Sequence, residues 1–135
     1  MKKVKQALLI DDVKTSRYLN RLVLTQSGVA HNIVEMTNAH DTLDYLVTPT
    51  ELGYPTPELI MLELALADGS SWDFLDSFAE LPEECTYKSI ICVLSDANIQ
   101  ENLQRARGNK WVKHFITKPL TLGKIANIMT ANFNR

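Results

Sequence analysis

Short apolar runs alternate along the chain with stretches in which apolar residues recur every three or four positions. The runs predict strands at residues 5–10, 31–36, 58–63, 89–94 and 112–116. The stretches with helical spacing predict helices at residues 15–26, 38–47, 71–81, 98–107 and from 122 onward. Several runs are continuously apolar, which is typical of strands buried on both faces. The order of elements therefore predicts a doubly wound α/β fold, a five-stranded parallel sheet covered by helices.

The length and the charge of the chain indicate how many domains it forms and which kinds of partner it does not bind. With 135 residues, the chain is expected to form one domain over residues 1–135. The formal net charge of −2 provides no basic excess to neutralise nucleic-acid phosphates. Apolar runs such as 7–10 and 90–94 are far too short to cross a bilayer, and the first of them stops at Asp11 without a signal-peptide core. We therefore expect a cytoplasmic protein that binds neither nucleic acid nor membrane.

The cysteines and histidines do not suggest a disulfide framework or a metal centre. Cys92 lies inside an apolar run and is expected to be buried, whereas Cys85 is expected in a loop, both as free thiols. His31, His40 and His114 share no metal-ligand spacing, so each is expected at the surface or at a strand edge.

Polar side chains follow the predicted strands at the edge where a parallel sheet usually carries its site. Asp11 and Asp12 follow the first strand, and Glu63 ends the third. Ser95 follows the fourth strand and Lys118 the fifth. Clustered carboxylates repel one another unless a cation joins them, and such oxygen ligands suit Mg²⁺. Because the lysine and the hydroxyl can donate to phosphoryl oxygens, the set predicts Mg²⁺-assisted phosphoryl transfer to or from a carboxylate.

Four motifs around these residues resemble the receiver domain of bacterial two-component response regulators, over essentially the whole chain. They are Leu8-Leu9-Ile10-Asp11-Asp12, Leu59-Ile60-Met61-Leu62-Glu63, Val93-Leu94-Ser95 and Phe115-Ile116-Thr117-Lys118-Pro119-Leu120. Their order and separations carry the resemblance. Segments 72–75 and 81–84 are most similar to short, stand-alone receivers without an output domain. The resemblance implies a flavodoxin-like (βα)5 fold with strand order 2-1-3-4-5.

The resemblance also implies a metal site at the phosphoacceptor. Asp11 and Asp12 match the acidic pair that binds Mg²⁺, with Asp12 the more direct ligand. Glu63 stands at the phosphoacceptor position. Its carboxylate and the backbone carbonyl of Ala65 complete the implied ligand set.

Further positions match the residues that sense the phosphoryl group. Ser95 matches the hydroxyl that shifts toward it, Lys118 the lysine that pairs with it, and Pro119 the proline that often follows in a cis bond. Phe115 matches the switch aromatic on the face formed by the fourth helix, fifth strand and fifth helix. The resemblance implies that this face contacts a histidine kinase or a downstream target, and the same face often mediates dimers in the family.

Glu63 departs from the family, which has Asp at this position. The extra methylene moves the carboxylate by about one bond length, whereas Mg²⁺ coordination and in-line phosphoryl transfer tolerate little displacement. We therefore expect efficient phosphorylation to be lost. Two interpretations stay open. The longer carboxylate reaches Lys118 or Ser95 and holds an active-like state, or it forms an ion pair with Lys118 that mimics nothing, since a phosphoryl group brings nearly two charges.

Three other positions also depart from the family pattern. Ala67 stands where a proline is usual, Ser71 where a glycine is common, and Asp96 where a small residue is usual. A carboxylate at Asp96 would oppose an incoming phosphate. The alternative, which we favour, is that Asp96 turns outward and caps the next helix.

These observations leave two functions open. The first is a pseudo-receiver that acts through protein contacts, with at most residual phosphotransfer or autodephosphorylation activity. The second is a working receiver that accepts phosphate from a histidine kinase with Mg²⁺. Trp111 is either an interface anchor or partly buried against the last helix. A hydrolase is disfavoured because Val13 stands where a second acid is needed, and nucleotide binding because no glycine-rich loop follows the first strand.

Overall fold

A five-stranded parallel sheet organises the chain, in the order β2-β1-β3-β4-β5. The computed structural model describes residues 3–96 and 100–133. The strands are β1 (Val4–Ile10), β2 (Ala30–Met36), β3 (Leu59–Glu63), β4 (Ile90–Ser95) and β5 (Val112–Thr117). Every neighbouring pair is parallel. The predicted α/β class, the doubly wound arrangement and the strand order are all confirmed.

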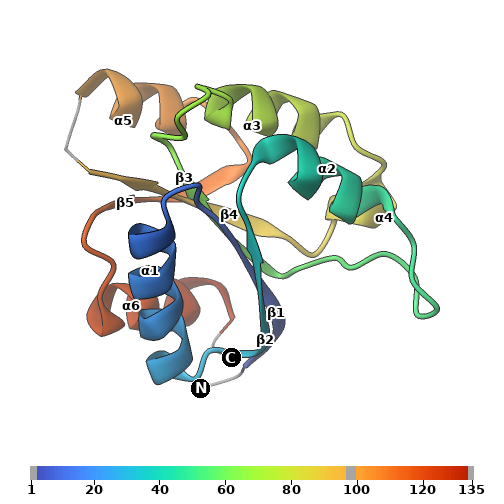
Figure 1. Cartoon of the computed structure of the whole chain (residues 1–135), viewed down its shortest axis with the longest axis horizontal. Helices are drawn as coiled ribbons and strands as arrows, with labels where there is room; N and C mark the ends of the chain where they lie inside the picture. Colours follow the sequence, from blue (N-terminus) through green and yellow to red (C-terminus); the bar gives the residue numbers. More distant parts are fainter. Residues whose placement is uncertain (1–2, 97–99, 134–135) are drawn as a thin grey trace.

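Helices cover both faces of this sheet (Figure 1). Those in the described residues are α1 (Lys14–Ser27), α2 (Ala39–Val47), α3 (Ser71–Ala79), α4 (Glu83–Thr86), α5 (Gln100–Arg107) and α6 (Leu122–Asn132). Helices α1 and α6 lie on one face, and α2, α3 and α5 on the other. The start of the helix predicted at 98–107 falls at residues 97–99, which lie outside the described residues.

The short helix α4 is absent from the sequence prediction, which has five helices and a loop at Cys85. That prediction is wrong: Cys85 is buried within α4. Pro82 breaks the preceding helix but stands directly before α4, where a helix needs no backbone N–H from it. Glu83 and Glu84 in its first turn suit the positive end of the helix dipole. A helix of four residues is too short to show a periodic pattern.

Two apolar cores lie between the sheet and its helices. Odd-numbered positions of β1 and β3, such as Leu9 and Met61, face α1 and α6, whereas Leu8 and Ile60 face α2 and α3. Because both faces are covered, the central strands are apolar without alternation. Cys92 belongs to the first core, and burial raises the pKa of its thiol to about 12. Both cysteines are free, as expected.

The aromatic side chain of Trp111 lies against α3. Its ring meets that of Phe78 edge-on, with 5.2 Å between the centroids. The two rings belong to the core on the face opposite α6. The expectation that Trp111 packs against the last helix is therefore wrong, while its partial burial is confirmed.

Residues at the helix ends fix where the chain turns toward the site. Gly28 ends α1 in the left-handed conformation with φ of 65°, as its position after the predicted helix suggests. The side chains of Asn38 and Thr121 accept hydrogen bonds from backbone N–H groups at the starts of α2 and α6. Among the described residues, no helix has both the length and the apolar character that a membrane span requires.

Phe78→Ala should lower the free energy of unfolding by about 3 to 5 kcal/mol, because it empties a fully buried site beside Phe74 and Trp111. Urea unfolding followed by tryptophan fluorescence measures the change. Leu52→Ala is the matched control, since that side chain is 96% exposed and its loss should change stability by less than about 0.5 kcal/mol. Equal stability of the two variants would contradict this assignment of the core.

Candidate functional site

The predicted site residues meet at the carboxyl ends of the strands. Asp11 and Asp12 follow β1, Glu63 ends β3, Ser95 ends β4 and Lys118 follows β5. These four strands are neighbours in the sheet, so their ends form one edge. The carboxylates of Asp11 and Glu63 and the hydroxyl of Ser95 are buried among them.

The carboxylate of Asp11 is held by the start of α1. Its Oδ1 accepts a hydrogen bond from the Val13 N–H at 2.9 Å, and its Oδ2 accepts one from the Ser16 hydroxyl at 2.6 Å. The side-chain amide of Asn20 donates to the same Oδ2 at 3.5 Å. Both oxygens of this fully buried carboxylate therefore already have donors.

Asp12 is held differently, by the loop after β3. Its Oδ2 accepts a hydrogen bond from the backbone N–H of Ala67 at 2.9 Å. Its Oδ1 is buried and has no hydrogen-bond partner among the described residues. A buried carboxylate oxygen without a donor is costly, so this atom is available to a cation.

Glu63 and Lys118 form a buried ion pair at the centre of the site. The Oε2 atom of Glu63 contacts the Nζ atom of Lys118, and its Oε1 accepts the Ala65 N–H at 3.0 Å. The Glu63 side chain is only 3% exposed. The Glu63 carboxylate thus reaches Lys118, a contact that both interpretations of Glu63 allow.

The ammonium of Lys118 has two further partners. It donates to the Ser16 hydroxyl at 3.3 Å and lies 3.3 Å from Oδ1 of Asp96. Ser16 therefore bridges Lys118 and Asp11, because its own hydroxyl donates to Asp11. The Asp96 side chain is 70% exposed, and its carboxylate lies on Lys118. Whether it also caps the next helix stays a prediction, since residues 97–99 lie outside the described part of the chain.

Burial and charge have opposite effects on the pKa values of Glu63 and Lys118. Burial raises the pKa of Glu63, although its bonds from Lys118 and the Ala65 N–H act to lower it. Burial alone would lower the pKa of Lys118, but its bonds and charge attraction to Glu63 and Asp96 raise it overall. The charged form of the lysine is therefore favoured, and Glu63 depends on it to remain ionised.

Sequence reasoning missed the contribution of α1 to the site. Ser16, Arg17 and Asn20 all contact Asp11, with Arg17 Nη1 donating to its backbone carbonyl at 3.0 Å. Arg17 also pairs with Glu35 of β2 at 3.2 Å, which ties the helix to the sheet. The available signal was positional: these residues lie in the first two turns of the helix that follows the acidic pair, on the side that faces the strand ends.

The structure also places the remaining predicted positions. The Ser71 hydroxyl donates to the backbone carbonyl of Glu63 at 2.7 Å, a bond that a glycine could not make. The peptide bond between Lys118 and Pro119 is cis, the isomer that the resemblance implied. Phe115 is partly buried in β5, against the core on the α3 side. Ala65 donates its N–H to Glu63, and a role for its carbonyl stays a prediction.

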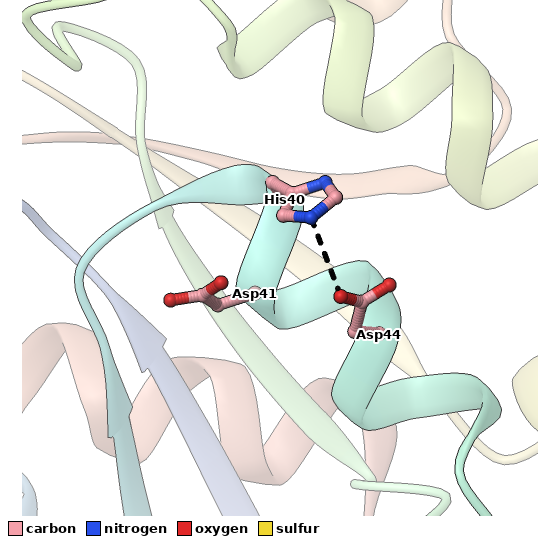
Figure 2. A group of neighbouring side chains, drawn as sticks. All are labelled: His40, Asp41 and Asp44. Carbon is pink, nitrogen blue, oxygen red and sulfur yellow. Dashed lines mark ion pairs between the residues drawn. The ribbon is translucent and has the colours of Figure 1, made fainter.

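A second group of polar side chains lies on α2, away from this edge (Figure 2). His40 Nε2 is 3.4 Å from Asp44 Oδ2, one helical turn away, and Asp41 is a near neighbour. All three side chains are exposed, and the ion pair marked in Figure 2 joins His40 to Asp44 and leaves out Asp41. The Asp41 carboxylate instead accepts a hydrogen bond from Asn38 at 2.9 Å. This arrangement is that of an exposed helical ion pair.

The oxygen donors at the strand ends fit a hard divalent cation at Asp12. The fit rests on the buried Oδ1 of Asp12, which has no other partner in the described residues, with Asp11 beside it in the chain. Lys118 and the Ala65 N–H each hold one oxygen of Glu63, and a role for Glu63 as a metal ligand stays a prediction.

Solved structures similar to this chain include response regulators, whereas no family model and no curated protein sequence matches it. A two-component response regulator from Cytophaga hutchinsonii has a TM-score of 0.87 at 23% identity, over 99% of this chain and 100% of that one. A response regulator receiver protein from Dyadobacter fermentans has a TM-score of 0.84 at 18% identity, over 97% and 99%. The chain has the receiver fold. The Mn²⁺-bound form of response regulator Rcp1 shares it, with a TM-score of 0.73 at 21% identity, over 93% and 92%.

In this receiver fold, Lys118→Met should destabilise the protein by about 3 kcal/mol at neutral pH, because it leaves the Glu63 carboxylate buried and unpaired. The folded-state pKa of Glu63 then rises further above its unfolded value. The stability of Lys118→Met falls as the pH rises from the unfolded-state pKa of Glu63 to its folded-state pKa. The loss of stability relative to wild type should therefore shrink as the pH is lowered toward about 5. Urea unfolding across this pH range measures it.

The double variant Glu63→Gln/Lys118→Met should recover most of the lost stability, because neither charge remains buried. Lys88→Met is the matched control, since this lysine is exposed at the opposite end of the strands. A Lys118→Met variant as stable as wild type at neutral pH would contradict the proposed dependence of Glu63 on its partner.

Proposed function

We propose that this chain is a single-domain response regulator in two-component signalling that acts through protein contacts without phosphorylation of Glu63. The receiver fold supports the general role. The observation that carries the specific one is the buried ion pair between Glu63 and Lys118. In this account the carboxylate at the acceptor position serves as a permanent partner of the lysine.

The geometry of Glu63 explains why it would be a poor acceptor. A carboxylate that attacks a phosphoryl group needs a free oxygen aligned with the leaving group. Here one oxygen accepts the Ala65 N–H and the other contacts Lys118. Attack would require breaking the ion pair inside a buried site, which leaves a costly unpaired charge during the reaction. The residues therefore favour a fixed state over a phosphorylation cycle.

Lys118 connects the ion pair with Glu63 to β5. It lies directly after β5, the strand that carries Phe115, and its backbone N–H donates to the Ser95 carbonyl at 2.8 Å. We propose that the attraction of Glu63 holds the end of β5 in one position, as an active-like state would. The alternative function is a working phosphate-accepting receiver, which the retained Asp11, Asp12, Ser95 and Lys118 would support and Glu63 opposes.

A divalent cation would be held mainly by Asp12, with Asp11 and the carbonyl of Ala65 beside it. When bound, a cation such as Mg²⁺ neutralises the acidic pair and attracts phosphoryl oxygens. Because Glu63 is committed to Lys118, we propose that this site binds Mg²⁺ more weakly than a complete receiver site. The Mn²⁺-bound form of Rcp1, which has the same fold, supports divalent-cation binding by this fold.

The proposed contact surface is the face formed by α5, β5 and α6, around Phe115. Because α4 was not predicted, α5 and α6 are the fourth and fifth helices of the sequence prediction. Hollows flank this side chain on both sides, one lined by Leu103 and Val112, the other by Lys124 and Ile128. A kinase, a downstream target or a second copy of the chain would seat side chains there. Trp111 supports the face from beneath through its contact with Phe78, so its burial argues against a role as an exposed anchor.

Incubation with a small acyl phosphate and Mg²⁺, followed by intact mass measurement, tests the proposal. Wild type should remain unmodified, because both Glu63 oxygens are engaged. Glu63→Asp should gain one phosphoryl group, because the shorter side chain releases Lys118 and restores the family acceptor. Glu63→Asp/Asp12→Asn is the matched control and should lose the modification with the cation ligand. A phosphoryl group on wild type at the rate of Glu63→Asp would overturn the proposal.

A further inference from the structure

The loop between β3 and α3, residues 64–70, is joined to the acidic pair by one long-range hydrogen bond. The N–H of Ala67 donates to Oδ2 of Asp12 at 2.9 Å, although the two residues are 55 positions apart. Asp12 is the residue whose other oxygen is buried without a partner in the described chain. The loop therefore occupies one half of the carboxylate that is best placed to bind a cation.

The loop is built to present this N–H group. Gly69 has φ of +73° and its N–H donates to the Leu66 carbonyl at 2.9 Å, which closes a turn around Ala67. Oδ1 of Asp68 accepts hydrogen bonds from the N–H and the hydroxyl of Ser70 at 3.0 and 2.6 Å. These bonds order the segment on both sides of Ala67, so its N–H is directed at Asp12 without further adjustment.

Both ends of the loop are anchored independently of Asp12. At its start, the Leu64 N–H donates to the Leu94 carbonyl at 2.9 Å. At its end, the Ser71 hydroxyl donates to the Glu63 carbonyl at 2.7 Å. Loss of the bond to Asp12 would therefore release the middle of the loop while β3 and α3 stay in place.

We propose that the Ala67 N–H is an internal latch on Asp12 that competes with a divalent cation for this carboxylate. The inference rests on the cation site of the proposed function. A backbone N–H that donates to a carboxylate lowers the negative charge available to a cation and fixes the orientation of both oxygens. The latch needs a residue other than proline at this position, because a proline has no N–H to donate. Cation binding and the position of the loop are thereby coupled.

Mn²⁺ binding followed by electron paramagnetic resonance tests the competition. Ala67→Pro removes the donor and should bind Mn²⁺ about tenfold more tightly than wild type, the effect of one hydrogen bond to a charged group. Ala67→Gly keeps the N–H and is the matched control, with an affinity close to that of wild type. Circular dichroism verifies that all three proteins are folded. Equal affinity of Ala67→Pro and wild type would overturn the latch and leave the cation site intact.

Hydrogen exchange without metal tests the latch by itself and does not depend on the proline variant. The Ala67 amide should be protected in wild type and should exchange at least tenfold faster in Asp12→Ala, because its acceptor is gone. The amide of Leu64, bonded to the Leu94 carbonyl at the anchored start of the loop, should be unchanged and serves as the internal control. Equal exchange of Ala67 in both proteins would overturn the inference. Protection in wild type together with no Mn²⁺ binding by any variant would instead overturn the proposed cation site, and the competition with it.

Discussion

The ion pair between Glu63 and Lys118 joins the central strand of the sheet to its edge strand at the point where all the polar groups meet. A carboxylate this deeply buried is tolerated only with a cationic partner and additional donors. Lys118 supplies the charge, and the Ala65 N–H supplies a donor. The positions of the surrounding groups follow from this constraint. Ser16 turns toward Lys118, and Asp96 approaches it from the solvent side.

Backbone and side-chain donors hold three of the four carboxylate oxygens of the acidic pair, and Oδ1 of Asp12 has no partner among the described residues. Asp11 is held by α1 and Asp12 by the loop after β3, so helix and loop both close on the strand ends. Lys118 and these donors together perform part of the charge compensation that a divalent ion would otherwise provide. The receiver fold is thereby combined with a site in which most of the polar groups are paired with one another.

The fold class and the polar residues at the strand ends were largely predictable from the sequence, because both follow from local pattern, whereas the strand order and the roles of the site residues were implied by the family resemblance. What the sequence could not show is which donor each polar group meets. The hydrogen bond from the Ala67 N–H to Asp12 uses the backbone, so the residue type does not reveal it. The contact of Ser16 with Asp11 depends on how α1 packs against the sheet, which the sequence does not show. Helix α4 was missed because four residues carry no period, and the partner of Trp111 was misplaced because either face of the sheet could accept it.

The central claim is that the Glu63 carboxylate belongs to Lys118 even when a divalent cation is offered. A crystal structure of the wild-type protein grown with saturating Mn²⁺, with the metal located by its anomalous scattering, tests this most directly. The account predicts that any Mn²⁺ lies on Asp12 and that Glu63 Oε2 remains on Lys118. Mn²⁺ coordinated by Glu63, with Lys118 displaced from the carboxylate, would contradict it.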